Sequence, residues 1–161
     1  NDSDVLNGDG GGDVLRGGNG SDQLNGGDGN DDLFGGAQRD ILNGGRGNDD
    51  LTGGGGRDTY VFGDGTYDNV SDYDGDFNRI FGFNFRETID FRPLDDVDTI
   101  TIVKLNNSTA LLTVDDGGSN EFDVRVNTNT AGLNLLLQDP TSVILADADV
   151  DFDTPDVFVL I

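Results

Sequence analysis

The chain contains no cysteine and no histidine among its 161 residues. The absence of cysteine excludes disulfides, thiolate metal sites and cysteine nucleophiles, so a small extracellular domain of this kind would need another staple, for which a bound metal is the obvious candidate. The absence of histidine excludes the Ser-His-Asp triad, the usual histidine zinc site and the commonest general base. Most familiar hydrolase chemistry is therefore ruled out.

Cationic side chains and long apolar runs are also scarce. There are 1 Lys and 8 Arg against 30 Asp and 2 Glu, which gives a formal net charge of −23. Nucleic acids and anionic membrane surfaces bind through Lys and Arg clusters, so neither is expected as a partner. No run of about 18 apolar residues is present, so no transmembrane segment is predicted.

What the chain has instead is aspartate and glycine. A chain with 34% apolar residues and this charge resists compaction unless cations neutralise it. Aspartate outnumbers glutamate fifteen to one, and a short carboxylate suits tight turns and hard-cation coordination. The sequence also starts in mid-pattern at Asn1 without a Met or a signal peptide, so we expect a piece from the C-terminal part of a longer protein.

Glycine divides the chain into two halves. Of the 26 glycines, 21 lie in residues 1–65, so the composition changes near Phe62. Within the first half a nine-residue period runs without a gap, in registers that begin at Gly8, Gly17, Gly26, Gly35, Gly44 and Gly53. Each register has an aspartate at its sixth position and, two residues later, a leucine or, in the last register, Tyr60. A strict period of this kind predicts a repeat architecture in which stacked units bury one another's apolar side chains.

The registers beginning at residues 17, 26, 44 and 53 fit the nonapeptide GGxGxDxUx, where U is apolar and Tyr60 counts as U. In this pattern residues 1 to about 66 resemble the repeats-in-toxin family. The resemblance implies an all-β fold: a parallel β-roll of stacked nonapeptide half-coils over residues 1–66, followed by a β-rich C-terminal cap with a secretion signal over residues 67–161. It also implies bound Ca²⁺, export by a type I secretion machinery and an extracellular location.

In such a roll the six residues GGxGxD form a turn and the last three form a short strand with one inward leucine. Every second loop then stacks on the same side, and the aspartates form two rows. The Asp22 row contains Asp4, Asp22, Asp40 and Asp58, and the Asp31 row contains Asp13, Asp31 and Asp49. Stacked carboxylates repel one another, and a divalent cation between each pair reverses the sign of that interaction.

The resemblance implies that each ion takes the carbonyl oxygens of positions two and four and the carboxylate of position six from one loop. The loop two repeats further along adds the carbonyl oxygens of positions one and three and its own aspartate, which gives six oxygens. Four such sets are Asp9, Gly11 and Asp13 with Gly26, Asp28 and Asp31; Gly18, Gly20 and Asp22 with Gly35, Ala37 and Asp40; Gly27, Gly29 and Asp31 with Gly44, Arg46 and Asp49; and Gly36, Gln38 and Asp40 with Gly53, Gly55 and Asp58. The remaining candidate ligands are Asp4 with Asp22 as a fifth set, Gly17 and Asn19 in the loop before Asp22, and Gly45 and Gly47 in the loop before Asp49. About five ions are expected.

Several positions depart from the pattern. Gln38 and Asp9 stand where glycine is expected, and a positive φ would cost Gln38 of order 1 kcal/mol. The next register, FGDGTYDNV, has Tyr67 in place of the aspartate, so the ladder is expected to end there. The second aspartates, Asp32 and Asp50, are expected to face solvent.

The second half is predicted to consist of strands. The segments are DTYVF, NRIFGFN, TIDF, DTITIVKL, TALLTV, EFDVRV, SVIL and DVFVLI. Alternation in DTITIVKL and EFDVRV indicates half-buried antiparallel pairs, and DDGGSN at residues 115–120 indicates a hairpin turn. AGLNLLLQD fits a short helix or a strand.

The segments RDTYVFGDG and FNRIFGFNFRETIDF resemble the transition out of the repeats in secreted proteases. Residues 156–161, an aspartate followed by five apolar residues, resemble the C terminus of type I secretion substrates and also fit a final edge strand that completes the cap.

Four interpretations follow. The first is a non-catalytic calcium-binding module that folds on extracellular calcium and carries the export signal. The second is an accessory module of a secreted epimerase, protease or lipase, in which Arg16, Arg39, Arg46 and Arg57 contact a polysaccharide; alginate-modifying epimerases carry modules of similar size and order. The third is a structural segment of a surface-layer protein or adhesin. The fourth is a Gly-Asp-rich disordered linker, which composition alone would allow.

Overall fold

The computed structural model describes residues 2–62, 77–83, 88–90, 99–106, 109–115, 121–128, 143–144 and 159–160. The first half contains β1 (Val5–Asn7), β2 (Val14–Asn19), β3 (Gln23–Asp28), β4 (Asp32–Ala37), β5 (Ile41–Arg46), β6 (Asp50–Gly55) and β7 (Thr59–Val61). The second half contains β8 (Phe77–Phe83), β9 (Thr88–Asp90), β10 (Thr99–Asn106), β11 (Thr109–Asp115), β12 (Glu121–Thr128), β13 (Val143–Ile144) and β14 (Val159–Leu160). No helix in this part of the chain is long and apolar enough to cross a membrane.

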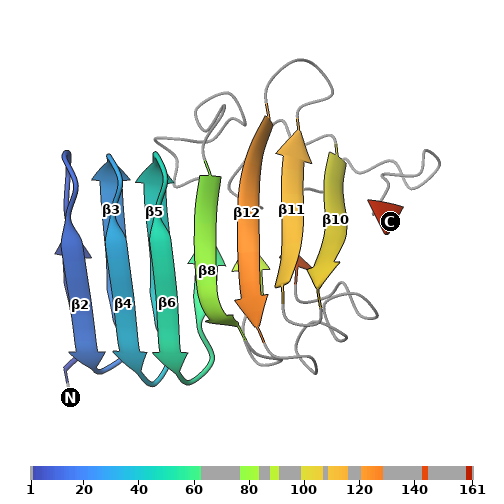
Figure 1. The fold of residues 1–161 in the computed structure, drawn as a ribbon. Coiled ribbons are helices and arrows are strands. Elements are labelled where there is room, and N and C mark those ends of the chain that lie inside the picture. The colour runs from blue at the N-terminus through green and yellow to red at the C-terminus, as the bar shows by residue number, and fades with distance from the viewer. Residues whose placement is uncertain are drawn as a thin grey trace.

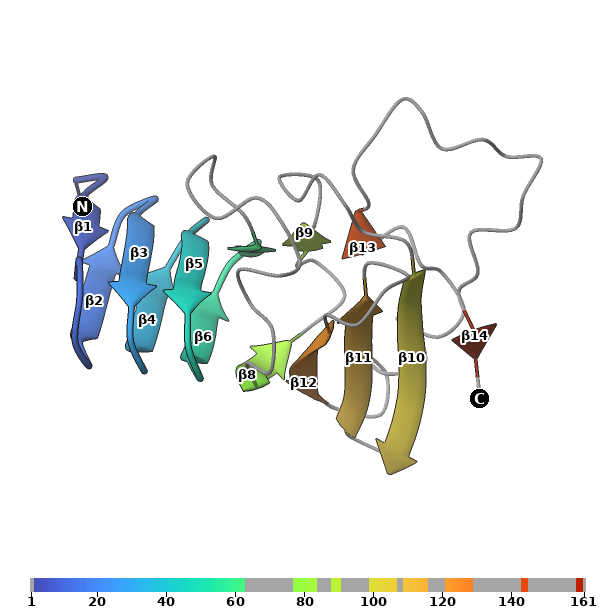
Figure 2. The ribbon, with the colours of Figure 1, turned by 90° about the horizontal axis from the view of Figure 1, so that it is seen from above.

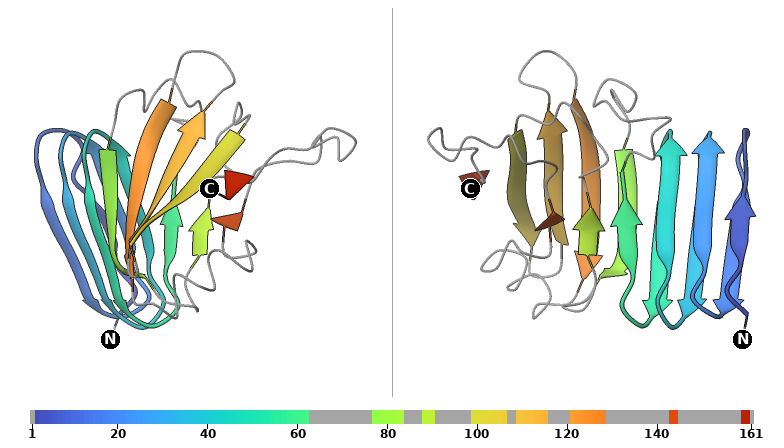
Figure 3. Two further views of the ribbon diagram at one scale, coloured as in Figure 1. Left: turned by 45° about the vertical axis from the view of Figure 1, so that its right-hand side comes forward. Right: turned by 180° about the vertical axis from the view of Figure 1, so that it is seen from behind.

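The first half is a parallel β-roll (Figure 1). Odd-numbered strands join one sheet in the order β1-β3-β5-β7, and even-numbered strands join the other in the order β2-β4-β6. Paired strands are two repeats apart, so that Leu24 pairs with Leu42 and Leu33 pairs with Leu51. Figure 2 shows the two sheets as facing layers, and Figure 3 shows the flattened coils stacked along the molecule. The predicted roll of half-coils is confirmed.

The predicted length of the strands was wrong. Each full half-coil has a six-residue strand that covers positions seven to nine and the next three positions, GGx, in place of a three-residue strand. The reason is that backbone groups at the start of each turn still pair with the next coil of the stack, as in the pair Gly27 and Gly45. Only positions four to six form the turn in the repeats whose strands have this full length.

The interior of the roll is a stack of leucines. Leu24, Leu33, Leu42 and Leu51 are all 0% exposed, whereas Leu6, in the first coil, is half-buried. Burying a leucine side chain stabilises the fold by about 2 kcal/mol, so each added coil contributes to the stability of its neighbours. The stack continues beyond the leucines through buried Tyr60, Ile80 and Ile89, and through Phe62 and Phe83.

The second half continues both sheets of the roll. β8 pairs with β6 and β9 pairs with β7, both in parallel. Beyond β8 the larger sheet runs β12-β11-β10-β14, where β10, β11 and β12 form the predicted antiparallel pairs. β14 pairs with β10 at the edge of this sheet, as predicted for a final edge strand. The segments 116–120, 131–139 and 156–158 lie outside the described residues.

Candidate metal centre

The aspartate of each repeat lies in the turn just before a strand, where the coil reverses direction. Stacking of the coils places these aspartates in the two expected rows. Asp22, Asp31, Asp40, Asp49 and Asp58 are at most 2% exposed, whereas Asp13 is half-buried and Asp4 is exposed at the open end of the roll. Burial of this many carboxylates requires strong compensation, because an isolated buried charge is very costly.

One oxygen of each buried aspartate has a fixed partner. The Oδ1 atom accepts a hydrogen bond from the backbone N–H of the preceding aspartate in the same row. The donor–acceptor pairs are Asp4 with Asp22 at 2.8 Å, Asp13 with Asp31 at 2.7 Å, Asp22 with Asp40 at 2.9 Å, Asp31 with Asp49 at 2.9 Å and Asp40 with Asp58 at 3.0 Å. The carboxylates are thereby held in one orientation along both rows.

The other oxygen has no protein partner. The Oδ2 atoms of Asp13, Asp22, Asp31, Asp40 and Asp58 are buried and accept no hydrogen bond. A buried acceptor left without a partner costs about 1–3 kcal/mol, and more when it carries charge. Five repetitions of this arrangement indicate a missing electropositive partner, which a cation would supply.

Backbone carbonyl oxygens face the same gaps between stacked loops. A Cβ placed on Gly17 would lie 2.5 Å from Asp22 Oδ2 and 2.7 Å from the carbonyl oxygen of Gly35, which belongs to the next loop in the row. A Cβ placed on Gly36, in the next loop, would in turn lie 2.2 Å from the carbonyl oxygen of Gly18. Glycine is therefore required here by space, because oxygens of both loops crowd the gap.

The carbonyl oxygen of position three already accepts one hydrogen bond. Gly11 N–H donates to Asp28 O at 2.8 Å, and Gly29 N–H donates to Arg46 O at 2.8 Å. A carbonyl oxygen has a second lone pair, so this contact leaves it able to bind a cation. Within the described residues no three acidic side chains gather as a metal site on their own, so a cation here would depend on carbonyl ligands as well.

The electrostatics of the rows agree with this geometry. Burial raises the pKa of Asp31, Asp40 and Asp58, and hydrogen bonds from the backbone oppose this rise only in part. The neighbouring carboxylates in the row raise the pKa of Asp31 and Asp40 further. Without a cation, the charged forms of these three carboxylates are therefore less favourable than they would be in water.

The two departures from the glycine pattern adopt the backbone conformation that glycine would. Among the described residues, Asp9 and Gln38 are the non-glycine residues with positive φ, at 69° and 83°. The expected strain at Gln38 is thus confirmed in its geometry. The turn itself is kept, because Gln38 N–H donates to Gly55 O at 2.6 Å.

The second aspartates differ from each other. Asp32 is exposed, as expected. Asp50 does not simply face solvent, because both of its carboxylate oxygens bind the guanidinium of Arg79, at 2.7 Å for the Nη2–Oδ2 contact. Asp50 thus remains partly exposed on the outer face, but it also has a partner that the sequence did not predict, because β8 lies beside β6 and brings the Arg79 guanidinium to it.

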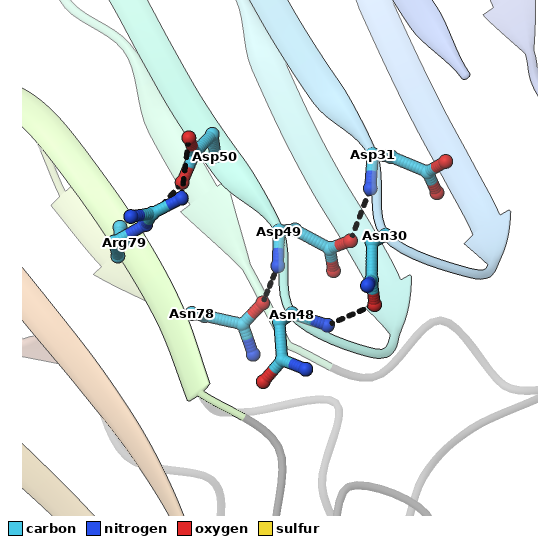
Figure 4. Close-up of polar contacts among 7 residues, drawn as sticks. All are labelled: Asn30, Asp31, Asn48, Asp49, Asp50, Asn78 and Arg79. Atoms are coloured by element: carbon cyan, nitrogen blue, oxygen red, sulfur yellow. Dashed lines mark hydrogen bonds and ion pairs between the residues drawn. The ribbon is translucent and has the colours of Figure 1, made fainter. Parts of the chain in front are cut away.

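Sequence reasoning missed one residue of the Asp31 row. Asn78, on β8, occupies the position after Asp49, and Asp49 N–H donates to its Oδ1 at 3.1 Å (Figure 4). A signal was present, because Asn78-Arg79-Ile80 keeps the spacing of Asp49-Asp50-Leu51 with asparagine in place of aspartate.

The fold and the turns define a parallel β-roll protein whose stacked loops present backbone and carboxylate oxygens along two edges. The family described as "RTX calcium-binding nonapeptide repeat (4 copies)" matches residues 1–33, 25–60 and 34–67, so the repeats of the first half are of this kind. This is a calcium-binding repeat family without catalytic function.

A similar fold occurs in the solution structure of the AlgE6R3 subunit of the mannuronan C5-epimerase of Azotobacter vinelandii. The TM-score is 0.57 at 24% sequence identity, over 94% of this chain and 86% of that one. At this identity the likeness extends to the fold alone. No curated protein sequence matches the chain.

Proposed function

We propose that this chain is a calcium-binding C-terminal module of a larger secreted protein, which folds on extracellular calcium and supports type I secretion. The observation that carries the proposal is the set of buried Oδ2 atoms without hydrogen-bond partners. Those of Asp13, Asp22, Asp31 and Asp40 each face the same gap as a carbonyl oxygen of a stacked loop. RTX repeats occur in secreted proteins, which supports an extracellular location.

Each ion would lie between two loops of one row. Gly18, Gly20 and Asp22 would bind it from one side, and Gly35, Ala37 and Asp40 from the other, with equivalent sets along both rows. Bound calcium supplies the positive charge that these oxygens lack. The residues themselves fix the carboxylates through Oδ1 and keep the gaps free of Cβ atoms.

Binding and folding are then one equilibrium. The unfolded chain, with a net charge of −23, has no assembled oxygen shell, so calcium binds the folded roll preferentially and stabilises it. Where calcium is scarce the repeats stay unfolded, which suits passage through an exporter. Where calcium is abundant they fold.

A calcium titration of the full chain, followed by circular dichroism from chelator to millimolar calcium, tests the switch. We expect a cooperative gain of β signal. Asp31→Ala and Asp40→Ala should raise the calcium midpoint by roughly tenfold or more, because each of these aspartates serves two gaps and tenfold corresponds to only about 1.4 kcal/mol.

The matched control is Asp32→Ala, which removes the same charge from an exposed position next to Asp31. Its midpoint should stay within about twofold of the parent value. Equal shifts for Asp31→Ala and Asp32→Ala would show that total charge, and not position in the row, decides folding. An unchanged spectrum across the titration would refute calcium-linked folding.

The secretion role rests on the end of the chain. Among the described strands β14 pairs with β10 alone, so its removal leaves the described loops of the roll in contact with their own ligands. Deletion of residues 156–161 should abolish release of a fused cargo through a type I exporter, whereas the calcium midpoint of the repeats should change little. Full secretion of the truncated fusion would place the export signal upstream.

A second candidate is an accessory role in contact with a polysaccharide. The observation that favours it is the Arg16 guanidinium, which lies 4.3 Å from the centre of the Phe34 ring on the outer face of the roll. Arg39, Arg46 and Arg57 are also exposed. The net charge of −23 opposes a polyanionic ligand, which is why this role ranks second.

A further inference from the structure

Asn78 lies at the place where the Asp31 row would receive its next aspartate. The register of β8 on β6 pairs Asp50 with Arg79 and Leu51 with Ile80, so Asn78 falls opposite Asp49. The two-point ion pair between Arg79 and Asp50 holds this register one residue away (Figure 4). The separation along the chain is 29 here, in place of the 18 between Asp31 and Asp49.

The Asn78 side chain repeats the contact that the aspartates make. Its Oδ1 accepts the Asp49 N–H at 3.1 Å, as Asp49 Oδ1 accepts the Asp31 N–H at 2.9 Å. Asn78 is 1% exposed, and its Nδ2 atom is buried without a hydrogen-bond partner. Nδ2 is therefore the counterpart of the Oδ2 atoms that face the gaps elsewhere, with a donor in place of an acceptor.

We infer that Asn78 is the terminal ligand of the Asp31 row. This inference rests on the proposed function. The Asn78 Oδ1 contributes one oxygen to a further calcium site, to which Asp49 and the carbonyl oxygens of Gly45 and Gly47 contribute from the other side of the gap. Amide oxygens are ordinary calcium ligands, so asparagine can replace aspartate on this side.

The same side chain closes the row on its far side. An aspartate at residue 78 would place a second, negatively charged oxygen on the side away from Asp49, where it would add buried charge without taking part in this site. The Nδ2 group is a donor and repels a cation, so the row ends without a surplus negative charge. Asn78 thus has only one of the two properties that Asp31 and Asp49 combine: it binds toward the preceding loop and not toward the following one.

The test is the number of calcium ions bound by the full chain, measured by equilibrium dialysis, with their affinities from calorimetry. Asn78→Ala should bind one ion fewer than the parent chain. Asn78→Asp should bind the same number, with one ion held roughly tenfold more tightly, because a carboxylate replaces an amide at that site.

The matched control is Asn127→Asp. Asn127 is a half-buried asparagine on β12, and its Oδ1 accepts a hydrogen bond from Thr109 Oγ1 at 3.4 Å, but it lies outside the loops of the roll. This variant should bind the parent number of ions with no ion held more tightly. Tightening in Asn127→Asp equal to that in Asn78→Asp would overturn the assignment, because added charge alone would then explain it.

Retention of all ions by Asn78→Ala, with each affinity within about twofold of the parent value, would overturn the inference and leave Asn78 as a hydrogen-bonding cap. If Asn78→Ala does not fold in calcium, the test rests on Asn78→Asp. Calcium affinities equal to those of the parent chain at every site of Asn78→Asp would also overturn the inference. A parent chain that binds no calcium would refute the proposed function itself.

Discussion

At the scale of the residue, the loops show which positions need glycine for its backbone and which need it for its size. Gly29, at position four of its repeat, has a φ of 140°, and a Cβ there would lie 1.9 Å from the carbonyl oxygen of Gly11. Gln38 occupies the same position of the next repeat with a φ of 83°. One repeat therefore tolerates a side chain where its neighbour has no room for one.

Replacement of Gln38 by glycine should stabilise the calcium-loaded roll. Removal of a side chain from a left-handed conformation relieves of order 1 kcal/mol, which corresponds to a rise of about 3 °C in Tm for a chain of this size. Thermal unfolding in saturating calcium measures the shift. The reciprocal variant Gly29→Gln should lower Tm by more than this, since it adds a steric clash to the backbone strain. A lower Tm for Gln38→Gly would show that its side chain stabilises the loop.

At the scale of the element, the sequence predicts the roll because its information is local. The nine-residue period can be read directly from successive repeats of the sequence. It predicts which residues point inward, namely Leu24, Leu33, Leu42 and Leu51. Strand length was less accessible, because the pairing of Gly27 with Gly45 is a property of two stacked coils and of no single repeat. Candidate ligands such as Asp31 and Asp40 could be named for the same reason as the leucines.

The β8 strand shows where local information fails. Leu51 pairs with Ile80 and Tyr60 pairs with Ile89, so the nine-residue period resumes, but only after an insertion that separates these partners by more than two repeats. The shared spacing of Asn78-Arg79-Ile80 and Asp49-Asp50-Leu51 does not by itself place Asn78 beside Asp49, and nothing in the sequence pairs Asp50 with Arg79. Both the terminal residue of the row and the ion pair beside it therefore required the structure.

At the scale of the whole molecule, the negative charge opposes folding, and protonation of carboxylates can stabilise the folded roll as bound calcium does. The raised pKa values of Asp31, Asp40 and Asp58 mean that the calcium-free roll holds protons more tightly than the unfolded chain does. Their stabilising effect is fully present below the unfolded pKa of about 4 and is lost as the pH rises through the raised folded values.

In calcium-stripped buffer, β signal should therefore increase as the pH is lowered from about 7 toward about 4, measured by circular dichroism at low protein concentration with light scattering as a check for aggregation. The triple variant Asp31→Asn, Asp40→Asn and Asp58→Asn should show a smaller dependence on pH, because it lacks the three carboxylates whose pKa is raised on folding. A spectrum of the parent chain that stays constant over this range would contradict the predicted direction.

The pairing of β8 with β6 and of β9 with β7 also restricts how many nonapeptides can be added to the roll or removed from it. Duplication of two consecutive nonapeptides adds one whole coil and returns the chain to the same side, so both strands still meet their own sheets. Duplication of a single nonapeptide adds half a coil and exchanges the sides, which would bring the Asn78 segment against the Asp22 row. Lineages that keep the second half joined to the roll in this way can therefore lengthen or shorten the roll only by even numbers of nonapeptides.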